Sequence, residues 1–249
     1  LSTRAALAVL AVTLLLCKTA AAAFYAIATV MLILKGSVKT QTRAGLVLMF
    51  IVMTFPISRM TGLFPADDLV NLAGNYLSPD RAQSLEFRFD NETLLLDKAL
   101  ERPYFGWGGF SREHIFDPDT GKDLTVQDGT WIIILGIFGV SGFLAYYLLL
   151  LVPFVMMLRS LPHVVGDNTR LMFSALGLLV AFFSVNTLPN SEFGLLQFFA
   201  AGGLGALAEV LPKETAARAR AFKEKALAAK TSQPERQAPP NAHGGMHVA

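Results

Sequence analysis

The sequence predicts an all-helical, polytopic membrane protein, with a bundle of about six transmembrane segments and one large loop outside the cytoplasm. Hydrophobic residues make up 53% of the chain, and its mean hydropathy is +0.48. Charged residues are held to 16%, whereas about a quarter is usual in soluble domains. The chain begins with Leu1 and lacks the cleavage pattern of a signal peptide, so we interpret it as the C-terminal part of a longer polypeptide.

The first predicted region, residues 1–64, holds apolar segments around a basic loop. Residues 5–34 are apolar apart from Lys18, and a single helix of about 30 residues would be roughly 45 Å long. Because the hydrocarbon core of a bilayer is only about 30 Å thick, we expect the chain to turn near Lys18. The alternative is one tilted helix that keeps Lys18 in a polar interior. At a helix end, the Lys18 amine can instead snorkel to the interface.

The loop at residues 35–43 carries three basic residues and no acidic one, which places it in the cytoplasm. The span at residues 44–64 therefore runs outward. Pro56 predicts a kink in it, because proline removes a backbone hydrogen bond. Arg59 lies about one turn from its outer end, where it either snorkels or faces the same cavity as the arginines of the following loop.

Residues 65–129 form the predicted large loop, with six basic and thirteen acidic residues, as expected outside the cytoplasm. Ser78 and Pro79, followed by an acid, are typical of a helix start. Helical periodicity continues to Leu100, and Pro103 ends it. We therefore expect an amphipathic helix of about 23 residues on the outer face.

Arginines recur at multiples of seven along this predicted helix, at Arg81, Arg88 and Arg102, with Leu95 in the remaining place. Such spacing leaves them on one stripe, because the drift is only about 20° per heptad. Either the guanidinium groups bind phosphate oxygens, or they pair with acids such as Glu92 on a solvated face.

The rest of the loop holds the other candidate side chains. A glycine-rich turn with Phe105 and Trp107 can bring backbone close to a ligand or to the membrane surface. Arg112 follows, and then His114, the single histidine of the loop, is either an exposed surface residue or a general base. Asp128 lies at the mouth of the next span, where it either caps the helix or exchanges a proton with substrate. The sequence shows no metal-binding pattern, phosphate loop or nucleophile motif.

Residues 130–212 predict three further spans, at residues 131–158, 171–188 and 193–211. The first reads as uninterrupted, with Trp131 at the membrane interface. Its small residues recur every three positions and would let another helix pack closely; they are Gly136, Gly139 and Gly142.

The last region, residues 213–249, has seven basic and three acidic residues and therefore reads as cytoplasmic. Its first half is rich in alanine and predicts a helix able to lie on anionic headgroups. Residues 233–249 contain proline and glycine and predict disorder.

Two motifs carry a family resemblance. A Pro-x-x-Gly-x-Gly element occupies residues 103–108, and a Leu-Gly-x-x-Gly-x-x-Gly span occupies residues 135–142. With an arginine early in the loop, and with Asn186 and Pro189 between the last two spans, this order resembles the C-terminal half of the bacterial O-antigen ligase and O-antigen polymerase family.

The resemblance implies a multi-pass enzyme of the bacterial inner membrane, with the large loop periplasmic and the C-terminus cytoplasmic. Such enzymes make surface polysaccharides, including lipopolysaccharide and exopolysaccharide. They transfer a glycan from a polyprenyl diphosphate carrier to a sugar or lipid-glycan acceptor, without metal, nucleotide sugar or other cofactor. The implied partners are these substrates and the lipid bilayer, and no nucleic acid.

Carried onto this chain, the family pattern places Arg88 at the early loop arginine and Arg112 as a second one. Lys18 falls where the family often has a basic residue. Asp128 stands where ligases have a histidine: either it replaces that base, or the acceptor differs, or the chain is no ligase. The predicted catalytic residues are Asp128, Arg88 and Arg112, and the predicted substrate-binding residues are Arg102, Lys18, Arg81, Trp107, Phe105 and His114.

Two other classes of function fit the same features. A polysaccharide export or flipping component would also hold a lipid diphosphate, but it needs cations along a route through the bilayer. A structural subunit would use the loop only as a docking surface. Convergence of Arg88, Arg112 and Asp128 on one pocket would favour the enzyme.

Overall fold

The computed structural model describes residues 2–16, 20–191 and 194–231. Within these residues the fold is all-helical, and the only strand-like pairing is an isolated bridge between Phe116 and Asp123. The order of helices is α1 (Thr3–Leu16), α2 (Ala20–Lys35), α3 (Val38–Met60), α4 (Ala66–Tyr76), α5 (Pro79–Leu100), α6 (Thr130–Ser160), the short 3-10 helix η1 (Leu161–His163), α7 (Asp167–Asn186) and α8 (Leu195–Thr231).

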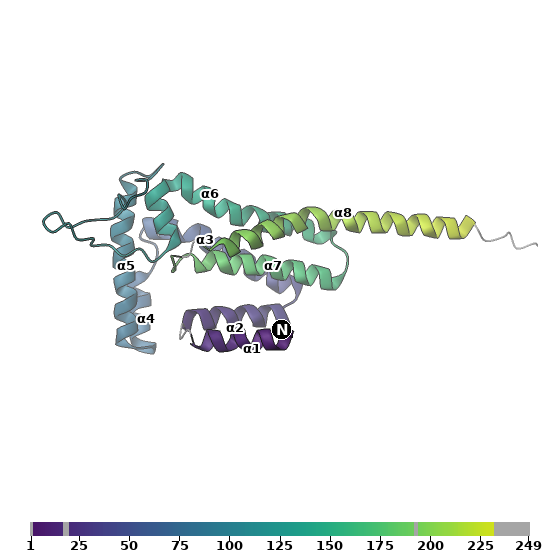
Figure 1. Cartoon of the computed structure of the whole chain (residues 1–249), viewed down its shortest axis with the longest axis horizontal. Helices are drawn as coiled ribbons and strands as arrows, with labels where there is room; N and C mark the ends of the chain where they lie inside the picture. The colour runs from purple at the N-terminus through teal and green to yellow at the C-terminus, as the bar shows by residue number, and fades with distance from the viewer. Residues whose placement is uncertain (1, 17–19, 192–193, 232–249) are drawn as a thin grey trace, which may run out of the picture.

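Four of the described helices are long and apolar enough to cross a membrane, namely α3, α6, α7 and α8. Figure 1 shows them running together as a bundle, with the shorter α1 and α2 side by side along it. Residues 5–34 thus form two helices, as a turn near Lys18 requires, although Lys18 itself lies outside the described residues. With 14 and 16 residues, α1 and α2 are shorter than a usual span, so six membrane segments remain a prediction.

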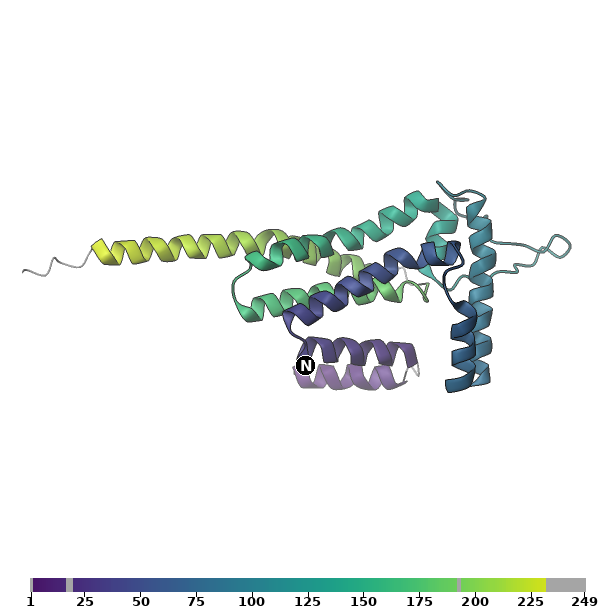
Figure 2. The same ribbon diagram turned by 180° about the vertical axis from the view of Figure 1, so that it is seen from behind.

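Helices α4 and α5 lie side by side across one end of this bundle, which we name the capped end (Figures 1 and 2). The predicted start of α5 is confirmed, because the Ser78 hydroxyl accepts a hydrogen bond from Arg81 N at 3.3 Å and Pro79 is the first helical residue. The helix ends at Leu100, three residues before Pro103.

Helix α6 is not the uninterrupted span that its sequence predicts. Gly139 has φ 66° and ψ −165°, a conformation open to glycine and outside the helical region. The helix therefore bends there: its first turns lie beside α5, and the rest runs along the bundle (Figures 1 and 2).

Trp131, which was predicted to lie at the membrane interface, faces protein and not lipid headgroups. Its side chain is fully buried in the first turn of α6, and its ring packs edge-to-face against Phe55 of α3 with centroids 5.4 Å apart. An apolar helix buried beneath another helix has the same composition as a membrane span, so the sequence alone did not separate them.

The break in α6 is filled by the Pro-x-x-Gly-x-Gly segment, residues 103–108. Backbone groups that a helix break leaves unpaired need other partners, and this segment provides them. The hydrogen bonds run from Trp107 N to Gly136 O (2.8 Å), from Gly108 N to Ile137 O (2.8 Å), from Val140 N to Pro103 O (2.7 Å) and from Ser141 N to Tyr104 O (3.2 Å).

Two glycines make this close approach possible. A Cβ on Gly106 would lie 2.5 Å from the carbonyl of Ile137, and one on Gly139 would lie 2.5 Å from the carbonyl carbon of Tyr104. The glycines of α6 were predicted to admit another helix. Gly139 instead allows the loop segment at residues 103–108 to pack closely against α6.

At the other end of the bundle, buried Gln41 of α3 joins three elements. Its Nε2 lies 3.2 Å from Leu32 O and 3.3 Å from Ile33 O, so it satisfies carbonyls at the end of α2. Its Oε1 accepts a hydrogen bond from the Ser174 hydroxyl of α7. Helix α8 continues past the bundle in one piece (Figure 1), so the predicted span at 193–211 and the helical part of the tail are a single helix.

Candidate functional site

Arg88 and Asp128 meet at the capped end. Arg88 Nε of α5 lies 3.5 Å from Asp128 Oδ2, just before α6 begins, and Arg88 Nη1 lies 3.5 Å from Pro189 O in the turn between α7 and α8. The side chains are 45% and 31% exposed, respectively. A cation and a carboxylate from distant parts of the sequence therefore stand together and are partly exposed.

Asp128 does not cap α6, which was one of its two predicted roles. The capping residue is Gly129, and no side chain caps this end. Thr130 N instead donates to Thr187 O at 2.9 Å and to Asn190 O at 3.0 Å. Because the turn after α7 supplies these acceptors, the Asp128 carboxylate is available to Arg88.

A second ion pair, between Arg59 of α3 and Glu92 of α5, lies in the protein interior. Arg59 Nε is 3.3 Å from Glu92 Oε2, and each side chain is only 8% exposed. Arg59 Nη2 also donates to Phe89 O at 3.0 Å and to the Thr93 hydroxyl at 3.2 Å. The Arg59 side chain is therefore buried against α5 and does not snorkel outward, and it fastens α5 to the end of α3.

Glu92 links this pair to α6, because Trp131 Nε1 donates to Glu92 Oε1 at 3.4 Å. Burial raises the pKa of Glu92, and the charge of Arg59 opposes the rise. Arg88 does not form the predicted alternative pair with Glu92, one turn along the helix. Instead, Arg88 pairs with Asp128, and Glu92 pairs with Arg59.

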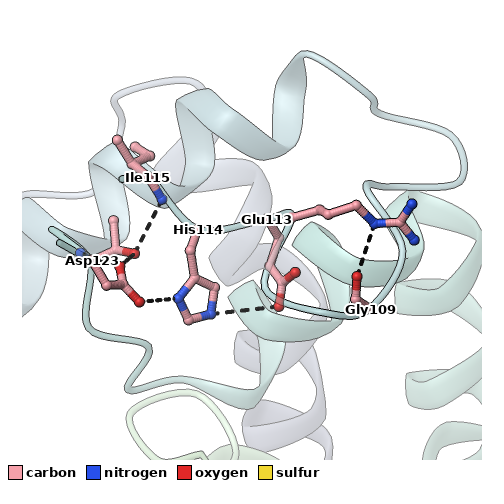
Figure 3. Close-up of polar contacts among 7 residues, drawn as sticks. Gly109, Glu113, His114, Ile115 and Asp123 are labelled. Atoms are coloured by element: carbon pink, nitrogen blue, oxygen red, sulfur yellow. Dashed lines mark hydrogen bonds and ion pairs between the residues drawn. The ribbon is translucent and has the colours of Figure 1, made fainter. Parts of the chain in front are cut away.

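His114 lies between two carboxylates on the hairpin that follows α5 (Figure 3). Its Nδ1 is hydrogen-bonded to Asp123 Oδ2, and its Nε2 is 3.6 Å from Glu113 Oε1. The hydrogen bond from His114 is the main cause that lowers the pKa of Asp123. Glu113 is buried and packs against Gly136, beside the break in α6. We name these residues, Glu113, His114 and Asp123, the His114 cluster.

Arg112 is held apart from the Arg88–Asp128 pair. Its Nε donates to Gly109 O at 3.0 Å, within the turn that precedes the His114 cluster. Its guanidinium also lies against Gly108, where an added Cβ would be 2.5 Å from Nη2. Of the three predicted catalytic residues, the structure thus joins Arg88 with Asp128 and leaves Arg112 on a separate turn.

The predicted stripe of three arginines is wrong for Arg102, because α5 ends before it. The Arg102 guanidinium instead lies 4.1 Å from the centre of the Trp107 ring, and the Lys98 ammonium lies 3.7 Å from it. Trp107 Nε1 donates to Lys98 O at 2.7 Å. Phe105 is 81% exposed, and Arg81 is exposed in the first turn of α5.

Sequence reasoning did not select Glu113 and Asp123, or the pairing of Arg59 with Glu92. A signal for the first two exists: the turn-forming residues 118–121 lie between them and predict a hairpin that brings Asp123 opposite His114. For Arg59 and Glu92 there is no local signal, since their contact depends on how α5 lies across α3.

Among the described residues, no group of three His, Cys, Asp or Glu side chains is placed to hold a metal ion. A cavity of about 130 Å³ borders Arg59 between α4 and α5, and the acids Asp67, Glu86 and Asp90 line it. It includes none of the predicted catalytic residues.

Comparisons of the chain with protein-family models, with curated proteins and with solved structures found no match. The basis for a function is therefore the chemistry of the capped end. There, a partly exposed cation and carboxylate stand beside the ends of apolar helices.

Proposed function

We propose that this protein is a membrane glycan transferase that moves a polyprenyl-diphosphate-linked glycan to a sugar hydroxyl at the outer side of the inner membrane. The observation that carries the proposal is the Arg88–Asp128 pair, 3.5 Å apart and partly exposed at the end of an apolar bundle. The resemblance to the O-antigen ligase and polymerase family supports the same reaction.

The two side chains suit the two halves of this reaction. The guanidinium of Arg88 binds the diphosphate of the carrier and stabilises the charge on it as it leaves. The acceptor hydroxyl attacks the anomeric carbon, the bond from that carbon to the diphosphate oxygen breaks, and the oxygen keeps the electron pair. The hydroxyl proton passes to the Asp128 carboxylate.

The ion pair also links carrier binding to proton transfer. While the site is empty, Asp128 is held by Arg88. A bound diphosphate competes for the guanidinium and frees the carboxylate to accept a proton.

We assign the base to Asp128 and not to His114. Both ring nitrogens of His114 face carboxylates, those of Asp123 and Glu113, so neither is directed at a substrate. Arg112 and Arg102 would contact the sugar or phosphate from the turn that follows α5. Their place on that turn supports a role in binding.

The proposal is tested by measuring glycan transfer from a purified polyprenyl diphosphate carrier in vesicles that contain the full chain. We expect Arg88→Ala and Asp128→Asn each to lose about 10²- to 10³-fold in rate, the usual effect of removing one transition-state contact or proton-transfer group. His114→Gln should retain most of the activity.

Arg218→Ala is a matched control, because Arg218 is an exposed arginine of α8 far along the chain from the site. Full activity of both Arg88→Ala and Asp128→Asn would exclude this site. Absence of transfer by the parent protein, with the carrier still bound, would favour an export or flipping component. Absence of both would favour a docking subunit.

A further inference from the structure

The part of α6 that follows its break is about as long as the hydrocarbon core of a membrane is thick. From Val140 to Ser160, α6 continues without a further break, for about 21 residues. At about 1.5 Å per residue this length is roughly 31 Å, which matches the thickness of the hydrocarbon core. When this part spans the core, Gly139 lies at the core boundary of the capped end.

Residues 103–108 are fixed at the same depth, because they bond to the first residues of the membrane-spanning part. Val140 N donates to Pro103 O at 2.7 Å, and Ser141 N donates to Tyr104 O at 3.2 Å. Figures 1 and 2 show the loop that follows α5 next to the bend of α6.

Three aromatic side chains of this loop are largely exposed. Tyr104 is 76% exposed, Phe105 is 81% exposed and Phe110 is 97% exposed. Phe110 and Ser111 also adopt φ values of 67° and 56°, which cost non-glycine residues about 1–2 kcal/mol each. The backbone of this turn is therefore strained, and the Phe110 ring that it carries is directed away from the protein.

We propose that Tyr104, Phe105 and Phe110 form an interfacial anchor that inserts into the lipid leaflet at the capped end. Aromatic rings prefer the boundary between headgroups and acyl chains, which is the depth fixed by the bond to α6. Arg102, stacked on nearby Trp107, supplies positive charge for the lipid phosphates, whereas the Lys98 ammonium is paired with Glu101 at 3.1 Å. The anchor holds the loop at the level where a lipid-linked substrate carries its polar head.

The test uses the full chain with Cys17→Ser and with Phe110→Cys carrying an environment-sensitive fluorophore, reconstituted in vesicles of phosphatidylcholine and phosphatidylglycerol. We expect blue-shifted emission and strong quenching by a nitroxide attached high on a lipid acyl chain. Asp119→Cys is the control, because this residue is exposed at the turn of the hairpin. At position 119 we expect emission typical of water and quenching at least three-fold weaker.

Phe105→Cys, labelled in the same way, keeps the test valid if the turn at Phe110 does not tolerate the change. Equal, weak quenching at positions 105, 110 and 119 overturns the proposal. Blue-shifted emission without lipid quenching also overturns it, and would place a protein surface over these rings. The measurement needs no transfer activity, so its outcome is independent of the proposed function.

Discussion

Helix α5 makes two ion pairs with other parts of the molecule, and they differ in burial. In the first pair, Arg59 Nε lies 3.3 Å from Glu92 Oε2, and both side chains are 8% exposed. In the second pair, Arg88 Nε lies 3.5 Å from Asp128 Oδ2, and the side chains are 45% and 31% exposed. The residues of α5 involved, Arg88 and Glu92, are one turn apart. A buried pair cannot exchange its partner for a ligand without leaving a charge uncompensated, while a partly exposed pair can. The first pair therefore positions α5, and the second pair is open enough to exchange its partner for a ligand.

The largest effect expected from this comparison is on stability. Arg59→Ala leaves the Glu92 carboxylate buried without its partner, which typically costs about 3–5 kcal/mol. The free energy of unfolding in mixed micelles would measure the loss. Adding Glu92→Leu should recover most of it, since the buried charge is then removed.

If the variant with both Arg59→Ala and Glu92→Leu is as unstable as Arg59→Ala alone, then loss of the ion pair does not explain the lower free energy of unfolding. The guanidinium also lies 5.4 Å from the Phe64 ring and 5.1 Å from the Phe89 ring. Loss of this packing would then explain the result.

A smaller effect is expected at the backbone contact that holds the loop beside these pairs. Gly139→Ala places a Cβ 2.5 Å from the Tyr104 carbonyl carbon at a φ of 66°, which we expect to cost about 2 kcal/mol. Thermal unfolding of the reconstituted protein checks it. Gly202→Ala in α8 meets nothing within 4 Å and should be neutral or slightly stabilising. Equal stability of the two variants would show that the loop is not held at Gly139.

The exposed pair is expected to respond in activity and not in stability. Arg88→Lys keeps the charge but loses the planar fork that matches phosphate, so transfer should fall about 10-fold. The free energy of unfolding should change by less than about 1 kcal/mol, as is usual for exposed pairs. A large loss of stability would mean that Arg88, like Arg59, fastens the helix.

The smallest effect concerns pH. Burial raises the pKa of Glu92 above its ordinary value of 4.5, so the folded protein keeps this proton to a higher pH than the unfolded chain. The stabilisation from this group is complete below pH 4.5 and is lost as the pH rises through the folded pKa.

Unfolding midpoints measured from pH 4.5 to 8 should therefore fall more steeply in the parent protein than in Glu92→Gln. Asp97→Asn makes the same chemical change on the exposed side of α5 and should leave the slope unchanged. A Glu92→Gln variant with the parent's slope would contradict this assignment.

Local chemistry predicted helix α5 of the capped end, but it did not predict helix α4 or the break in α6. The start of α5 followed from Ser78 and Pro79, because a capping hydroxyl and a proline at the first position act within a few residues. The pairing of Arg88 with Asp128 could not be predicted, because it joins residues forty positions apart and depends on the angle at which α5 crosses the bundle. Arg112 was grouped with them through the family resemblance, and its guanidinium is instead bonded to Gly109 O within its own turn.

By itself, the sequence determined that the chain is helical, that it is apolar enough for a membrane, and where its acidic loop and amphipathic helix lie. These properties depend on composition, periodicity and caps, all of which act over a few residues. Only the tertiary structure decided that α6 breaks at Gly139, that Trp131 is buried under α5, and that Arg59 pairs with Glu92. An apolar run reads the same whether lipid or protein surrounds it, and a charge takes whichever partner the packing of the helices brings within reach.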